Sequence, residues 1–205
     1  MAYKYDIFVS YRHDDAMADW VHKHFRPFLE SFVGQALNRK ISLFVDRDGI
    51  AGGDVWPAKL HNALACSRAM VAVWNPLYFD SPWCRRECAS MMYREAKLGY
   101  GAPGHPKGLV VPVKVFDGEY FPDKASARQC LDCRNYWVVG EGFTKTEGYV
   151  TFQQMLQKWA PNVAAAVHGA PAWQADWLTD QSWFAVPDGD LFPKSTANFS
   201  FTGLE

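Results

Sequence analysis

The sequence predicts an α/β domain, a flavodoxin-like three-layer sandwich in which helices cover both faces of a five-stranded parallel sheet. Short apolar runs alternate along the chain with longer segments of helical periodicity, as strand-helix-strand units require. Several of these runs are hydrophobic throughout, which is typical of strands covered on both faces. Five such runs favour the strand order 2-1-3-4-5 over the six-stranded order of dinucleotide-binding folds.

The five expected strands are short, apolar and rich in β-branched residues. They comprise residues 5–11 (YDIFVSY), 41–45 (ISLFV), 69–74 (AMVAVW), 109–115 (LVVPVKV) and 135–139 (NYWVV).

Helical spacing of apolar residues fills the segments between the strands. Residues 15–33 show this spacing, and Pro27 should kink or divide the helix because proline cannot donate the backbone hydrogen bond. Ser81 is expected as the N-cap and Pro82 as the first residue of a helix that runs to residue 98. Further helices are expected over residues 54–65, 122–130 and 149–167.

The regular pattern ends near Gly169, which places an α/β domain at residues 1–168 and an extension at residues 169–205. The extension contains seven aromatic residues. Because so many aromatic side chains are unfavourable in water, we expect the extension to pack on the domain or on a neighbour in an oligomer.

Composition indicates an ordinary globular protein, with 49% hydrophobic residues, 21% charged residues and a net charge of −1. Nucleic acid is not an expected partner, since phosphate binding needs an excess of basic residues. The first fifteen residues contain too short an apolar run for a signal peptide or a membrane span, so we expect a cytoplasmic protein without a membrane partner. The five cysteines are expected to remain reduced thiols in the cytoplasm, and their spacing does not predict a metal site.

Several motifs point to functions that their context excludes. Residues 99–104 (GYGAPG) match a dinucleotide-binding pattern, but they follow a helix and precede a strand, the reverse of what that loop needs. Trp74 and Asn75 end the third strand, where a phospho-receiver domain carries its acceptor aspartate. His22 and His24 alternate on a helix, so they cannot share one face as paired ligands.

The segment SPWCRREC, residues 81–88, places Glu87 one helical turn after Trp83. No Lys or Arg stands three or four residues from Glu87, so the sequence offers no helical ion-pair partner. A solvated surface charge is the ordinary interpretation of such a glutamate. A partly exposed carboxylate beside an indole and small apolar groups is also what catalytic sites use, and those neighbours should raise its pKa.

Topology predicts where a site should form. In an open α/β sheet, ligands bind beyond the carboxyl ends of the strands, where the strand order reverses. That point lies between the first and third strands, where the loops 10–14 and 74–78 meet. The helix with Glu87 follows the second loop, and the glycine-containing segment 46–56 should form a mobile lid beside it.

Two stretches resemble signature regions of TIR (Toll/interleukin-1 receptor) domains. Residues 5–15 (YDIFVSYRHDD) look like the first signature box, and residues 46–87 look like the segment from the BB loop to the third family helix. The resemblance covers roughly residues 3–168 and includes the positions Trp56, Ser67, Ser81, Trp83, Cys84 and Glu87.

The resemblance implies a flavodoxin-like fold and two occupations. Many TIR domains, especially those of bacteria and plants, cleave the nicotinamide–ribose bond of NAD+ to nicotinamide and ADP-ribose or a cyclic ADP-ribose isomer, with NAD+ as substrate and no cofactor. Glu87 matches the glutamate that the family uses for catalysis. Animal receptor adaptors instead only bind other TIR domains and commonly lack this glutamate. We therefore expect a bacterial-type NAD+ nucleosidase or ADP-ribosyl cyclase in immune or anti-phage signalling.

Two alternatives stay open, namely a non-enzymatic TIR–TIR adaptor module and another N-glycoside enzyme of similar fold, such as a nucleoside deoxyribosyltransferase.

In an NAD+-cleaving enzyme, Glu87 should hold the ribose hydroxyls and stabilise the oxocarbenium-like transition state. Trp83 could form a wall for a base ring or only cap the core, and Arg12 could pair with the diphosphate or remain solvated. Further substrate contacts are expected from Ser10, Tyr11, Asp46, Arg47 and Asp48, the last three ordering when TIR–TIR self-association occurs.

Overall fold

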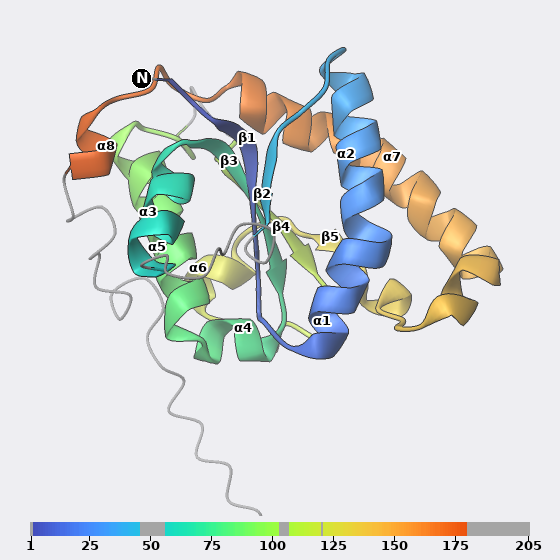
Figure 1. Ribbon diagram of the computed structural model, residues 1–205. Coiled ribbons are helices and arrows are strands. Elements are labelled where there is room, and N and C mark those ends of the chain that lie inside the picture. Colours follow the sequence, from blue (N-terminus) through green and yellow to red (C-terminus); the bar gives the residue numbers. More distant parts are fainter. Residues whose placement is uncertain (1, 46–55, 103–106, 120, 180–205) are drawn as a thin grey trace, which may run out of the picture.

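Figure 1 shows the computed structural model, which describes residues 2–45, 56–102, 107–119 and 121–179. Five parallel strands form one sheet in the order β2-β1-β3-β4-β5. The predicted fold class and strand order are therefore confirmed. The strands are β1 (Tyr5–Tyr11), β2 (Leu43–Val45), β3 (Ser67–Trp74), β4 (Val110–Lys114) and β5 (Leu131–Asp132).

Helices cover both faces of the sheet (Figure 1). One face carries α1 (Asp15–Trp20), a π-helical stretch (Val21–Phe25), α2 (Arg26–Ala36) and α7 (Glu147–His168). The other carries α3 (Trp56–Ala65), α4 (Pro76–Asp80), α5 (Pro82–Lys97) and α6 (Asp123–Ser126), with the short α8 (Asp176–Thr179) against α3.

The strand β1 shows why the central runs are continuously apolar. Its side chains alternate between two cores, so Ile7, Val9 and Tyr11 join the α1/α2/α7 side while Phe8 joins the α3/α5 side. All four are at most 1% exposed. Ser10 is a small polar residue of β1 whose side chain faces α5. Because both faces of the sheet are covered, this hydroxyl is buried and needs a hydrogen-bond partner on that side.

The predicted fifth strand at 135–139 is wrong. The strand lies earlier, at Leu131–Asp132, and is followed by a 3₁₀ turn over Arg134–Tyr136. Tyr136 and Trp137 pack against the α1/α2/α7 core, and the Trp20 indole N–H donates to the Tyr136 carbonyl at 2.8 Å. Tyr136 and Trp137 therefore serve side-chain packing rather than a sheet ladder, while Val138 and Val139 are exposed.

Three helical segments also differ from expectation. The segment predicted to be helical over 15–33 runs on to Ala36 and is divided by the π-helical stretch, which ends two residues before Pro27. The helix expected over 122–130 is confined to α6. The helix α4 was not expected at all, although Asn75 and Pro76 are an N-cap and a first helical residue.

The start of the C-terminal extension contacts the α/β layers. The Tyr3 hydroxyl donates to the Pro171 carbonyl at 2.8 Å, and the Trp173 indole N–H donates to the Ala65 carbonyl at 3.3 Å. Trp177 is 1% exposed, with the Arg94 guanidinium 4.1 Å from its ring centroid. The division of the chain into a domain and an extension at residue 168 stays a prediction.

In the described part of the chain, no helix is both long and apolar enough to cross a membrane. The same residues contain no group of three His, Cys, Asp or Glu side chains that could hold a metal ion.

Candidate functional site

Local capping signals position the segment that carries Glu87. Asn75 Oδ1 accepts from the Tyr78 N–H at 2.7 Å and begins α4 directly after β3. Ser81 Oγ then accepts from the Cys84 N–H at 3.4 Å and begins α5, with Pro82 as its first residue, as the sequence predicts. The second turn of α5 consequently carries Glu87 to the carboxyl end of the sheet, beside β1.

Glu87 lies in a buried hydrogen-bond chain with residues of β1 and α4. The Ser10 hydroxyl donates to Glu87 Oε2 at 2.5 Å, and the Tyr78 hydroxyl lies 2.8 Å from Ser10 Oγ. Since Ser10 has one proton and gives it to the carboxylate, the Tyr78 hydroxyl must donate to Ser10. Each hydroxyl polarises the next, so the chain directs two O–H dipoles at the carboxylate.

Burial sets the protonation state of Tyr78. The side chain is fully buried, and desolvation, followed by the neighbouring Cys88 and Cys84 thiols and Glu87, raises its pKa well above 10. Tyr78 therefore remains a neutral hydrogen-bond donor at any physiological pH.

The two cysteines of α5 also face this region. Burial raises the pKa of Cys88 to about 12, so its thiol stays protonated beside Tyr78. The Cys84 thiol donates to the Tyr11 carbonyl at 3.5 Å and ties α5 to the end of β1. Both cysteines pack as small apolar residues that set the distance between α5 and the sheet.

Glu87 itself is 4% exposed, so the expectation of a partly exposed side chain is wrong. The reason is tertiary, because α5 packs against β1 and β3 and brings the Glu87 carboxylate to the Ser10 hydroxyl. A glutamate with such burial must be hydrogen-bonded to remain in the fold, and Ser10 provides one of those bonds.

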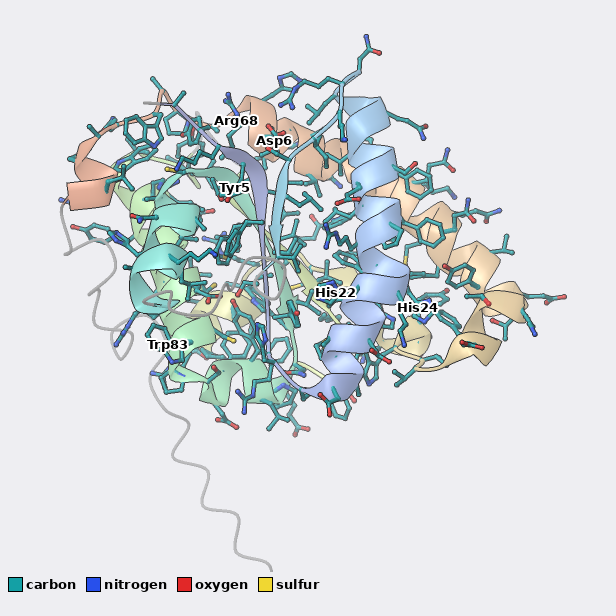
Figure 2. The ribbon with its side chains drawn as sticks, viewed as in Figure 1. Tyr5, Asp6, His22, His24, Arg68 and Trp83 are labelled. Atoms are coloured by element: carbon teal, nitrogen blue, oxygen red, sulfur yellow. The ribbon has the colours of Figure 1, made fainter. Side chains whose placement is uncertain are left out.

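The structure does not bring the Tyr11 side chain to Glu87. Tyr11 is 1% exposed and faces the opposite layer, where its hydroxyl lies 3.1 Å from His22 Nε2 and its ring stacks on His13 at 4.6 Å. His24 packs edge-on against aromatic rings near α7, so His22 and His24 point to different neighbours (Figure 2).

Arg12 and Trp83 lie at the same end of the sheet as Glu87. Arg12 is exposed immediately after β1, and its side chain forms no ion pair within the described ranges. Trp83 is half-buried in the first turn of α5, and the Arg86 guanidinium lies 5.3 Å from its ring centroid. Figure 2 shows Trp83 at the opposite end of the molecule from Asp6 and Arg68. Asp46, Arg47 and Asp48 lie outside the described residues.

Tyr78 is the site residue that the sequence analysis did not identify, since it treated residues 74–78 as a loop. The available signal was Asn75-Pro76, an N-cap followed by a first helical residue, which begins a helix with Tyr78 in its first turn. Its partner Ser10 is 68 residues away in the chain, so no local pattern could have paired them.

A family model matches most of this chain. The model of the TIR domain matches residues 7–145. The TIR domain of the Toll-related receptor TRR-2 from Hydra magnipapillata is 16% identical with a TM-score of 0.45, over 75% of this chain and 99% of that chain. The TIR domains of the activated Roq1 resistosome, which recognises the pathogen effector XopQ, are 23% identical with a TM-score of 0.39, over 82% of this chain and 86% of that chain. A search of curated proteins finds no match.

The family match spans well over half of the chain and includes β1, β3, α4 and α5, the elements that build the Glu87 site. The protein therefore belongs to the TIR domain family.

Proposed function

We propose that this TIR domain cleaves the nicotinamide–ribose bond of NAD+, with Glu87 as the catalytic residue. The observation that carries the proposal is the 2.5 Å hydrogen bond from Ser10 to the buried Glu87, at the point of the sheet where strand order reverses. A carboxylate held this way, with little water around it, is an arrangement suited to stabilising positive charge in a reacting substrate.

The chemistry needs little else from the protein. The nicotinamide ring of NAD+ is already cationic, so it leaves as a neutral molecule without a proton donor, and positive charge develops on the ribose. A fixed carboxylate near that carbon lowers the barrier, because charges interact more strongly where water is excluded. Ser10 and Tyr78 would keep the Glu87 carboxylate oriented without competing for the substrate.

Other residues at this end of the sheet offer contacts for the rest of NAD+. Arg12 is exposed and could pair with the diphosphate, while the half-buried Trp83 offers an indole edge for a base ring. Asp46, Arg47 and Asp48 remain proposed contacts, and Tyr11 would act through the position of the β1 end. We place the activity in a cytoplasmic setting of immune or anti-phage signalling, where the five cysteines, which form no disulfide within the described residues, would stay reduced.

Nicotinamide release from NAD+ by the purified protein, followed by chromatography, tests the proposal. Glu87→Gln keeps the size and a hydrogen-bond acceptor but removes the charge, so turnover should fall about 100-fold or more. The exposed Glu30, paired with Arg26 at 3.1 Å on α2, supplies the control Glu30→Gln, which should remain fully active. Full turnover by Glu87→Gln would remove Glu87 from the mechanism, and the same chromatogram distinguishes ADP-ribose from a cyclic isomer.

A second candidate function, assembly with other TIR domains, is favoured by apolar side chains at the same end of the sheet. Leu77, Phe116, Val138 and Val139 are 54%, 55%, 40% and 45% exposed, and they follow β3, β4 and β5. Exposed apolar residues of this size favour contact with another protein surface. Sedimentation over a range of protein concentrations would detect self-association. If nicotinamide release begins at the same protein concentration as self-association, assembly is a condition of catalysis.

A further inference from the structure

The short helix α4 joins the strand β3 to the helix α5, and its two sides have opposite environments. Leu77 is 54% exposed, whereas Tyr78 is fully buried and its hydroxyl lies 2.8 Å from Ser10 Oγ. A helix of five residues is too short to be stable by itself, so contacts with its neighbours must hold it. These contacts therefore decide where the Tyr78 hydroxyl lies.

The backbone of Tyr78 is fixed at both of its polar groups. Its N–H donates to Asn75 Oδ1 at 2.7 Å, directly after β3. Its carbonyl accepts from the Ser81 N–H at 3.2 Å, and Ser81 is the N-cap of α5. Asn75 and Ser81 are both buried, so water competes little for these bonds. Tyr78 is consequently tied both to the end of the sheet and to the helix that carries Glu87.

The next side chain, Phe79, anchors α4 on the sheet. Its ring centroid lies 5.4 Å from that of Trp74 on β3 and 5.0 Å from that of Phe121. Rings packed at these distances resist sliding, because a densely packed core leaves no space for a displaced ring. Packing therefore adds to the hydrogen bonds that hold α4 against β3.

Two paths lead from Tyr78 to Glu87. One follows the backbone from Ser81 into α5, and it fixes the Cα atom of Glu87. The other follows the side-chain hydroxyls through Ser10 to Glu87 Oε2, and it fixes the carboxylate. Removal of the Tyr78 hydroxyl therefore breaks the second path and leaves the first one intact.

A glutamate in a catalytic role needs such a restraint. Three rotatable bonds separate its carboxylate from the backbone, so an unrestrained carboxylate samples several rotamers. A reacting group that is misplaced by about 1 Å can lose about 100-fold in rate. Burial raises the pKa of Tyr78 well above its ordinary value, so its hydroxyl remains a neutral donor that can supply the restraint.

We propose that α4 is the positioning element of the Glu87 site. Asn75 fixes Tyr78, Tyr78 orients the Ser10 hydroxyl, and that hydroxyl holds the carboxylate. Asn75 and Tyr78 are thus positioning residues, which act on turnover through Ser10 and Glu87 without touching the substrate. The inference rests on the proposed cleavage of NAD+ by Glu87 and identifies what aligns that residue.

Steady-state kinetics of nicotinamide release test the proposal. The value of kcat should fall about tenfold in Tyr78→Phe and about threefold in Asn75→Ala, while KM changes less than about twofold. Asn75→Ser restores an N-cap oxygen and should recover most of kcat. Unchanged kcat in Tyr78→Phe would overturn the proposal, and unchanged kcat in Asn75→Ala would remove Asn75 from it. A rise in KM at constant kcat would assign Tyr78 to substrate binding and also overturn it.

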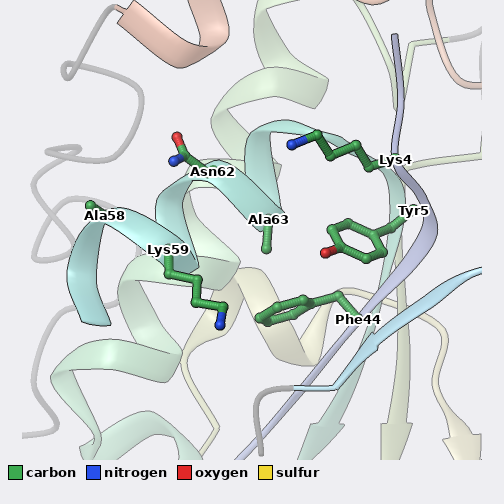
Figure 3. Close-up of a pocket in the computed structure, with 7 residues that line it drawn as sticks. All are labelled: Lys4, Tyr5, Phe44, Ala58, Lys59, Asn62 and Ala63. Carbon is green, nitrogen blue, oxygen red and sulfur yellow. The ribbon is translucent and has the colours of Figure 1, made fainter. Parts of the chain in front are cut away.

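Two controls separate positioning from other effects of the substitutions. Tyr5 lies on β1, as Ser10 does, but its hydroxyl faces a cavity of about 400 Å³ between β1, β2 and α3 (Figure 3). Tyr5→Phe should therefore leave kcat unchanged. Val163→Ala removes two methyl groups from the core on the opposite face of the sheet and should destabilise the fold at least as much as Tyr78→Phe. An equal loss of kcat in Val163→Ala would make stability the cause and contradict positioning.

A magnetic resonance measurement tests the hydroxyl chain without turnover. The buried Tyr78 hydroxyl proton should exchange slowly enough with water to give a resolved signal, which disappears in Tyr78→Phe. Glu87→Gln and Asn75→Ala should both shift this signal, because both positions are linked to Tyr78 by hydrogen bonds. An unchanged signal in Glu87→Gln would overturn the chain. Absence of nicotinamide release by the wild type would instead overturn the proposed function, and the proton signal would still decide whether the chain exists.

Discussion

Replacing Tyr78 by Phe removes one hydroxyl from the buried chain that ends on Glu87 while the ring keeps its packing. Ser10 Oγ then loses the donor that lies 2.8 Å away and has no water to replace it, since Ser10 is 1% exposed. Leaving a buried acceptor unsatisfied costs about 1–2 kcal/mol of unfolding free energy. A domain of this size loses roughly 2–4 °C of melting temperature per kcal/mol, so we expect a decrease of roughly 2–8 °C.

Thermal denaturation of a double-mutant cycle isolates the contact. Tyr78→Phe, Ser10→Ala and the double variant should show a coupling of about 0.5–1.5 kcal/mol, because removal of Ser10 leaves Tyr78 nothing to donate to at that position. Tyr149→Phe is the control, since its hydroxyl has no partner in the described part of the chain and its loss should cost less than about 0.5 kcal/mol. Additive effects of Tyr78→Phe and Ser10→Ala would refute the hydrogen-bond chain as we describe it.

Two further predictions concern stability away from the Glu87 site. Desolvation alone would raise the pKa of Asp6, but hydrogen bonds from Arg39 and Ser42 outweigh it and lower this pKa below 3.8. The ionised Asp6 therefore stabilises the native state above pH 3.8, and this contribution is lost as the pH falls through the lowered pKa. Asp6→Asn should cost about 1–2 kcal/mol at pH 7 because Arg39 is half-exposed, and urea denaturation should show a smaller difference from wild type near pH 3. Trp177→Ala should lower the free energy of unfolding by about 3 kcal/mol in the same assay, because it removes a buried indole that packs against the Arg94 guanidinium. A cost below about 1 kcal/mol would mean that residues 170–178 add little to the fold.

Elements with a local signal were predictable from the sequence. The strand β1 follows the predicted range, and Ser81-Pro82 begins α5, because an N-cap and a fixed proline φ act over a few residues. The fifth strand was not predictable by the same reasoning. Its apolar run at 135–139 has the composition of a strand, but Tyr136 and Trp137 are used to pack against Trp20 and the α1/α2/α7 core. Val138 and Val139 of the same run are exposed, so apolar composition alone decides neither burial nor strand formation.

The same distinction holds for the candidate site. The sequence alone determined that Glu87 would follow the third strand on a helix and that the strand order would bring it near β1, because both depend on local caps and on topology. Only the tertiary structure decided that Glu87 is buried and bonded to Ser10, 77 residues away, with Tyr78 behind it. Hydrogen bonds need atoms within about 3 Å in a definite orientation, and that precision arises only when α4, α5 and the sheet pack together.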